Sequence, residues 1–228
     1  MSPTAPYQYD ISHGPAYAQL KFDLKANQTV LVEAGGMAAM DPCVEMKSKV
    51  RGGLMKGVKR MLGGESLFLS EFTAKGQPGQ LFVSPGVPGD IQHYAIPEGR
   101  SLFVQSSGFV AASPTVEIDS KFQGFKGFFS GESLFLLHIL GPGDLWFSSY
   151  GAIFPVDVDG HYVVDSSFIV AFEDTLDYDI QILGGLKTGL LGGEGFVCRF
   201  SGKGKIWIQS RGVFQLVRFV NPFRPIRD

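Results

Sequence analysis

The sequence predicts an all-β protein built from three tandem copies of one short unit, with a β-sandwich or short double-stranded β-helix architecture. Three observations favour this class. Glycine (30 residues) and phenylalanine (20 residues) are abundant while only 18% of the residues are charged, which is typical of closely spaced strands and turns. A Gly-Glu motif recurs in three similar contexts, and short apolar runs separated by glycine follow each motif.

Length and charge narrow the class of protein further. The 228 residues, 44% of them apolar, can bury one substantial core, so we expect a single domain spanning residues 1–228. The net charge of −2 is not the electrostatic footprint of a nucleic-acid-binding protein. The N-terminus has no signal-peptide or transit-peptide pattern, and the apolar run 134–140 is shorter than the ~20 residues of a membrane-spanning helix. We therefore expect a cytoplasmic protein.

Internal repetition is the strongest signal in the chain. The pattern Gly-apolar-Lys, two adjacent apolar residues and then Gly-Glu begins at Gly57, Gly124 and Gly185. Because one such unit buries too little surface to fold alone, we expect the copies to pack about a pseudo-threefold axis into one continuous sheet structure. The copies are expected near residues 1–85, 86–150 and 151–228. The Gly-Glu turns are Gly64 with Glu65, Gly131 with Glu132, and Gly193 with Glu194.

Each Gly-Glu motif precedes two short apolar runs, which we expect to pair with each other as a hairpin. The first run of each copy lies at 66–69, 133–136 and 195–198. The second run, after a glycine turn, lies at 79–83, 143–147 and 204–208. Upstream, turns at 25–27, 97–99 and 158–160 are each expected to precede a further strand pair, within 30–37, 102–110 and 162–170.

The end of the chain is expected to add one more strand, at 213–220. Pro222 ends this strand, and we expect the arginine-bearing tail to lie as a tether across a neighbouring copy. Helix is expected to be minor and confined to a turn or two within 53–62.

These repeats resemble, over essentially the whole chain, the widespread family named for altered inheritance of mitochondria. The resemblance is carried by the order and spacing of segments 64–68, 131–135, 168–172 and 193–196. It implies a fold like that of the tryptophan RNA-binding attenuator protein (TRAP-like): a shortened double-stranded β-helix, in three copies, with N-terminal strands exchanged between copies. It also implies a tendency to form rings. Fungal members are linked to mitochondrial biogenesis, and no catalytic residue carries over.

The segments before the Gly-Glu motifs combine apolar and basic side chains. Equivalent positions in a threefold body emerge on one face, so these tips are expected to cluster. We predict that they dock onto a protein partner or an anionic membrane surface. The alternative is that they only seal the base of the body or a subunit contact. The residues concerned are Lys59, Met61, Leu62, Phe125, Lys126, Phe128, Phe129, Leu186, Lys187, Leu190 and Leu191.

No set of residues predicts a catalytic, cofactor or metal site. The three motif glutamates recur without histidine or cysteine, so we interpret them as groups that cap or pair within strand-entering turns. The four histidines occupy different phases of the repeat, and both cysteines are expected to be buried, reduced thiols. Neither Ser66 nor Ser133 lies in a nucleophile elbow. Convergence of His93, Glu98 or Asp159 in a deep pocket would instead indicate an enzyme.

Together these features predict a non-enzymatic β scaffold that self-assembles, as a trimer or larger ring, and presents a repeated apolar-basic face to its partner. Two alternatives stay open at this point. One is a small-molecule enzyme with an unrecognised site. The other is an RNA-binding protein, which rests on fold analogy alone.

Overall fold

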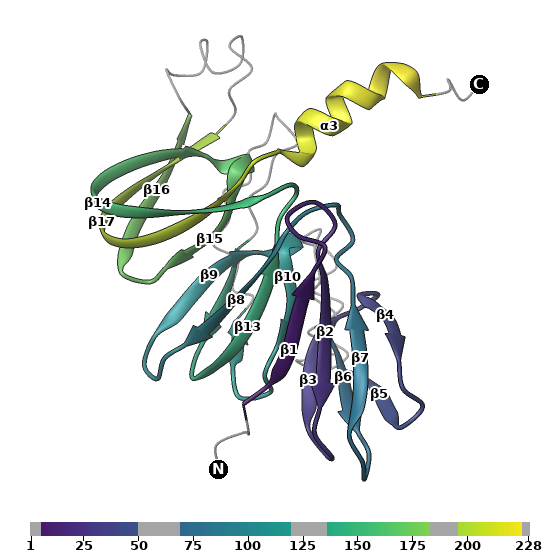
Figure 1. Cartoon of the computed structure of the whole chain (residues 1–228). Helices are drawn as coiled ribbons and strands as arrows, with labels where there is room; N and C mark the ends of the chain where they lie inside the picture. Colours follow the sequence, from purple (N-terminus) through teal and green to yellow (C-terminus); the bar gives the residue numbers. More distant parts are fainter. Residues whose placement is uncertain (1–5, 50–68, 120–135, 183–195, 225–228) are drawn as a thin grey trace.

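A computed structural model of the protein describes residues 6–49, 69–119, 136–182 and 196–224. These residues form three curled sheets, and every strand pairing within them is antiparallel (Figure 1). The all-β class is therefore confirmed. Figure 1 shows the N-terminal strands at one end of the body and the last strands at the other.

The first sheet has the order β1-β2-β7-β4, formed by Gln8–Ser12, Gln19–Leu24, Gly79–Val83 and Met37–Met40. The second has the order β5-β6-β3-β10-β13-β8, formed by Val44–Lys49, Leu69–Ala74, Thr29–Glu33, Phe109–Ala112, Gly143–Ser148 and Ile91–Ile96. The third has the order β11-β12-β9-β15-β17-β14, formed by Glu117–Asp119, Leu136–Leu140, Ser101–Gln105, Ile169–Glu173, Phe196–Gln209 and Ile153–Asp165. In addition, β16 (Leu176–Ile182) pairs with β17.

The strands form where apolar residues alternate with polar ones or run without interruption. In β2, Leu20, Phe22 and Leu24 are buried while the intervening side chains are partly exposed, which is the period-two pattern of a strand with one covered face. In β10 all four residues, Phe109–Ala112, are buried because both faces of this strand are covered.

The core is divided into three clusters. One joins residues of the second and third sheets, including Leu102, Phe109, Phe147 and Trp207. Another joins the first and second sheets around Phe22, Phe72, Leu81 and Trp146. The last lies within the curl of the third sheet and includes Phe172, Phe200 and Ile206. Full burial of one large apolar side chain is worth about 1.5–3 kcal/mol, so these clusters hold the sheets together.

The predicted hairpins are wrong. Strand β6 pairs with β3 and β5, whereas the next strand, β7, pairs with β2 and β4 in another sheet. Likewise β12 and β13 lie in different sheets. In these two copies the glycine-containing connections therefore carry the chain from one sheet to the next instead of reversing it within one sheet. In the third copy both runs lie on one continuous strand, β17. Apolar runs on both sides of a turn fit either arrangement, since both bury the same side chains.

The turn predicted at 158–160 is also wrong. Strand β14 continues through it and pairs with β17 without a break from Ile153 to Asp165. Gly160 and Gly202 lie opposite each other, with φ of 104° and 118°, a region that residues with a Cβ rarely adopt. These two glycines let the long ribbon bend sharply while its ladder stays intact, and Figure 1 shows the curl.

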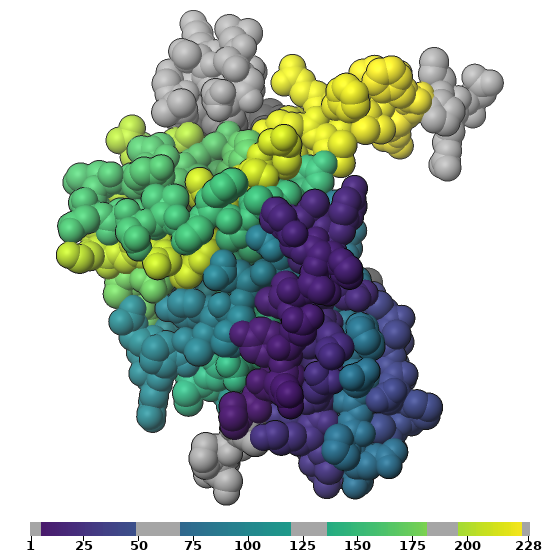
Figure 2. All heavy atoms as spheres, viewed as in Figure 1, coloured from purple at the N-terminus to yellow at the C-terminus, as the bar shows by residue number. Residues whose placement is uncertain are grey.

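The strand predicted at 213–220 is a helix, α3 (Val213–Val220), which begins after Gly212 and is followed by a 3-10 turn at Asn221–Phe223. Its sequence does not alternate between apolar and polar residues, so the period-two pattern of a strand is missing. None of its residues is buried. Figures 1 and 2 show α3 extending away from the sheets, so the predicted strand at 213–220 is wrong.

Candidate functional site

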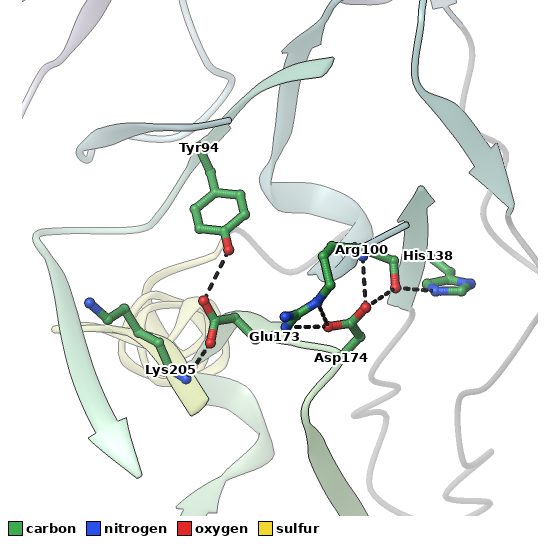
Figure 3. A network of polar contacts seen from close by, with 7 residues as sticks. Tyr94, Arg100, His138, Glu173, Asp174 and Lys205 are labelled. Carbon is green, nitrogen blue, oxygen red and sulfur yellow. Dashed lines mark hydrogen bonds and ion pairs between the residues drawn. The ribbon is translucent and has the colours of Figure 1, made fainter. Parts of the chain in front are cut away.

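Polar side chains gather where the second and third sheets meet, and Figure 3 shows them. Tyr94 comes from β8, and Glu173 ends β15, with Asp174 directly after it. His138 lies on β12, and Arg100 precedes β9, which begins at Ser101. These residues meet because β9 pairs with both β12 and β15. We call this group the junction cluster.

Asp174 is the acceptor at one end of the junction cluster. Its Oδ1 accepts from Nε and Nη2 of Arg100 at 2.9 and 2.8 Å. Its Oδ2 accepts from the amide of Ser101 at 2.8 Å and from the Ser101 hydroxyl at 3.1 Å. Partial burial raises the pKa of the Asp174 carboxyl, but the bonds from Arg100 and Ser101 outweigh it and lower the pKa below its ordinary value. The carboxyl is therefore ionised at neutral pH.

Ser101 links this carboxylate to an imidazole. His138 Nε2 lies 2.8 Å from Ser101 Oγ, and the imidazole stacks on Phe103 with ring centroids 4.6 Å apart. The hydroxyl of Ser101 has one proton, which it donates to Asp174, so His138 must donate its Nε2 proton to Oγ. A hydrolase needs the opposite order, in which histidine accepts the serine proton and a carboxylate orients the histidine. The geometry suits a structural link and does not activate Ser101 as a nucleophile.

Glu173 forms the other half of the junction cluster. Its Oε1 accepts from the Tyr94 hydroxyl and its Oε2 from the amide of Lys205, both at 2.9 Å. Burial, together with the bond to Glu173 and its negative charge, raises the pKa of Tyr94 to about 12. Tyr94 also packs edge-on against Trp207 at 5.3 Å. This tyrosine holds its proton over the whole neutral range and ties the second sheet to the third.

A second polar and aromatic group lies between the first and second sheets. His93 Nε2 bonds Asp144 Oδ1 at 2.7 Å, and the amide of Asp144 donates to Ser113 Oγ at 2.9 Å. The ring centroids of Tyr9 and His93 lie 5.3 and 5.0 Å from that of the buried Trp146. Figure 2 shows the N-terminal strands lying across the strands that follow them. The group therefore fixes the N-terminal strand to the body.

The structure does not bring together the three residues whose convergence would indicate an enzyme. His93 is bonded to Asp144 on the neighbouring strand β13. Glu98 is exposed in the turn between β8 and β9. Asp159 is exposed on the β14–β17 ribbon, where it pairs with Lys203 at 3.2 Å.

All the residues predicted to dock or to form Gly-Glu turns lie outside the described residues, so those assignments stay predictions. The docking residues are Lys59, Met61, Leu62, Phe125, Lys126, Phe128, Phe129, Leu186, Lys187, Leu190 and Leu191. The turn residues are Gly64, Glu65, Gly131, Glu132, Gly193 and Glu194. The helix predicted within 53–62 lies there too. Both cysteines are free thiols, but only Cys198 is buried as predicted, while Cys43 is half-buried.

Sequence reasoning missed the exposed apolar surface of α3. Its Val217 and Phe219 side chains are 54% and 70% exposed, and Phe223, just beyond the helix, is 75% exposed. Arg218 lies in its last turn and no acidic residue lies in its first. The signal for a helix was available, since residues 213–220 lack alternation and follow a glycine. Among the described residues, no helix is long and apolar enough to span a bilayer.

Comparisons with known proteins agree with this fold. A sequence model of the family described as mitochondrial biogenesis AIM24 matches residues 9–211. An uncharacterized protein of Streptococcus pyogenes serotype M6 is 28% identical in an alignment of 228 positions that covers 96% of this chain and 91% of that protein. The crystal structure of a Streptococcus pyogenes protein matches with a TM-score of 0.79 at 25% identity, covering 96% of this chain and 100% of the other. The family match spans nearly the whole β body, and the chain therefore belongs to the mitochondrial biogenesis AIM24 family.

Proposed function

We propose that this protein is a non-enzymatic β scaffold that self-assembles and presents an apolar-basic surface to a protein or membrane partner. The observation that carries the proposal is α3, which has six exposed apolar residues and an arginine but no buried residue. An apolar helix left uncovered costs free energy in water, which a partner surface removes. The predicted docking tips before the Gly-Glu motifs belong to the same proposal.

We also propose that the body consists of three copies of one TRAP-like module. Recurrent pairings support this when the strands of each copy are counted from β2, β8 and β14. The first strand pairs with the last: β2 with β7, β8 with β13, and the start of β14 with the end of β17. Pairings between the second and fifth strands, β3 with β6 and β9 with β12, support it in the same way. Repetition of one module offers repeated surfaces, which suits a scaffold.

The junction cluster fits this proposal better than it fits catalysis. Its carboxylates are occupied by donors of the chain itself, and its serine donates to an aspartate instead of to a histidine. Such satisfied networks rigidify a body. A rigid body is what a scaffold needs to hold its docking surfaces at fixed spacing.

Vesicle co-sedimentation tests the partner. The full chain is mixed with vesicles of phosphatidylcholine containing phosphatidylserine, and with vesicles of phosphatidylcholine alone. A membrane partner predicts binding to the anionic vesicles that Phe219→Ser abolishes and the matched control Gln215→Ser on the same helix retains. If the unmodified chain stays in the supernatant with both vesicle types, the membrane version is wrong and the protein version remains.

Light scattering on the native particle tests the scaffold itself. We expect a mass of several times the 24.8 kDa chain. A strict monomer at all concentrations would contradict self-assembly.

A further inference from the structure

Strand β4 is an apolar strand whose four residues, Met37–Met40, are all exposed. The strands at the corresponding positions in the second and third sheets are equally apolar but buried. In β10 all four residues, Phe109–Ala112, are buried, and in β15 residues 169–172 are buried. Apolar composition without burial singles out β4 as a surface that lacks its cover.

The correspondence rests on a shared irregularity in pairing. Strand β4 pairs with β7 through a register shift between Met37 and Ala39. Strand β10 pairs with β13 through the same shift between Phe109 and Ala111. Strand β15 pairs with β17 through a shift between Ile169 and Ala171. A β-bulge at one position of three strands identifies them as equivalent, with Ala39 in the place of Ala111 and Ala171.

The buried equivalents are covered because each has a strand on its second edge. Strand β10 pairs there with β3, which places Ala111 opposite Val32. Strand β15 pairs there with β9, which places Ala171 opposite Val104 and Phe172 opposite Phe103. Strand β4 pairs with β7 on one edge, and no described strand pairs with its other edge.

The second half of β14, near the other end of the chain, also has an unpaired edge among the described strands. The strands β3 and β9 each pair on two edges, whereas the second half of β14, the equivalent segment, pairs with β17 alone among the described strands. Its Tyr162 and Val163 side chains are 40% and 49% exposed. The protein therefore presents a β10-like edge at β4 and a β3-like edge at β14, and Figure 1 places these strands at opposite ends of the body.

We propose that a second copy of this chain covers β4 with the second half of its β14. The register of the internal contacts places Ala39 of one copy opposite Val164 of the other, and Met40 opposite Val163. The contact continues the antiparallel pairing already made twice within the chain, so its backbone and side-chain geometry are known to be compatible with this fold. The inference rests on the self-assembly proposed above and names its surface.

This contact is head to tail, because the two edges that meet are different surfaces. After two copies join, the copy that contributed β4 keeps a free β14 and the other copy keeps a free β4. Heterologous contacts of this kind generate a ring when the rotation closes and a filament when it does not. An exposed apolar edge strand is also an aggregation hazard, and pairing with a defined partner removes it.

Complementation between two blocked chains tests the inference. Met40→Lys places a charge on the β4 edge and leaves β14 free, while Val163→Asp does the reverse. We expect each variant alone to be a monomer of about 24.8 kDa by light scattering. An equimolar mixture is expected to give a particle of at least twice that mass, because the intact β14 of one chain meets the intact β4 of the other.

The matched control is Met46→Lys, on β5. Met46 is 51% exposed, but β5 is an outer strand of its sheet, as are its equivalents β11 and β16. This variant is expected to keep the mass of the unmodified protein. Circular dichroism verifies that all three variants retain the β fold, since each substitution is at an exposed side chain.

A disulfide test gives a second, independent readout. Chains carrying Met40→Cys and Val163→Cys, both with Cys43→Ser, are mixed and oxidised. Opposed residues of an antiparallel pair lie about 5 Å apart, which is within the reach of a disulfide. We expect a cross-linked heterodimer, and no cross-link when Met46→Cys replaces Met40→Cys.

The outcomes separate this inference from the function on which it rests. If the unmodified chain is monomeric, both self-assembly and the β4–β14 contact are wrong. If the unmodified chain assembles and the two charged variants assemble equally well, self-assembly holds and another surface carries it. A mixture of the two variants that stays monomeric also overturns the contact.

Discussion

Asp174 accepts hydrogen bonds from both the backbone amide and the hydroxyl of Ser101, at 2.8 and 3.1 Å. This pair closes the start of β9 against the end of β15 at the centre of the third sheet. The relationship has a measurable consequence for stability because the acceptor is charged and partly buried.

Asp174→Asn is expected to lower the free energy of unfolding at pH 7 by about 1–3 kcal/mol, since an amide accepts fewer bonds and carries no charge. The lowered pKa of Asp174 gives the sign of the pH effect. Its contribution is present above the unfolded pKa of about 3.9 and is lost as pH falls through the lower folded pKa. Urea unfolding at several pH values below 7 should show the two proteins converging in acid.

The control for this prediction is Asp177→Asn, at an exposed position on β16. Its stability should follow that of the unmodified protein across the same pH range. Equal acid sensitivity of the unmodified protein and Asp174→Asn would show that the Asp174 carboxylate does not stabilise the junction cluster.

Ionisation of Tyr94 is expected to lower the stability of the protein in alkali. Its pKa is raised from 10.0 to about 12, so its contribution is complete below pH 10 and is lost as pH rises from about 10 to about 12. Tyr94→Phe cannot ionise and should lose less stability over that window. Unfolding followed by circular dichroism measures this, with Tyr17→Phe, at a 73% exposed position, as the control. A parallel loss in Tyr94→Phe would refute the assignment.

Trp146 is fully buried, contacts Tyr7, Tyr9, Phe22 and His93, and has no hydrogen-bond partner for its indole Nε1 among the described residues. Trp146→Ala should cost about 3–5 kcal/mol by leaving a cavity. Trp146→Phe should cost less, because it keeps a ring in the same place and removes the buried donor. Urea unfolding of the two variants checks the order. If Trp146→Phe lowers the stability more than Trp146→Ala does, the indole N–H of Trp146 has a hydrogen-bond partner.

The two cysteines should differ in reactivity towards a thiol reagent. Burial, with a smaller effect of the Asp179 charge, raises the pKa of the Cys198 thiol to about 12, so almost no thiolate forms there at neutral pH. Cys43 is half-buried, and its Sγ lies 3.5 Å from the carbonyl of Pro78. We expect Cys43 to react in the native protein and Cys198 only after unfolding. Mass spectrometry of the labelled peptides identifies which thiol reacted, and labelling of native Cys198 would contradict the prediction.

The two ends of the chain should contribute unequally to stability. Ending the chain after Gly212 removes α3, which has no buried residue, so the free energy of unfolding should change by no more than about 0.5 kcal/mol. Removing residues 1–12 uncovers Trp146, so the melting temperature should fall and the tryptophan emission should shift to longer wavelength. Thermal unfolding of both truncations tests the contrast. A large loss on removing α3 would mean that the helix packs on the body.

The all-β class and the positions of many strands could be predicted from the chain alone. Alternation of Leu20, Phe22 and Leu24 and the continuous apolar runs of β10 and β15 indicate strands with one or two apolar faces, which is a property of local pattern. Family membership followed from segments whose order and spacing survive in the sequence. These signals are local, so a linear reading detects them.

Strand partners were decided by the tertiary structure. Consecutive apolar runs such as β6 and β7 bury the same side chains whether they pair with each other or with strands of separate sheets. The choice depends on long-range packing between residues far apart in the chain. For the same reason the junction cluster was not foreseen, since Arg100 and Asp174 share no motif and meet only because β9 lies beside β15.

The sequence by itself determined which segments are apolar and with what period, because both properties are given by the order of residues. The tertiary structure alone decided which edges are covered. Residues 37–40 are as apolar as the buried strand β10, yet they lie exposed, and no described strand pairs with the second edge of β4. Composition cannot report this difference, since covering a strand edge requires a partner in space and not a particular residue.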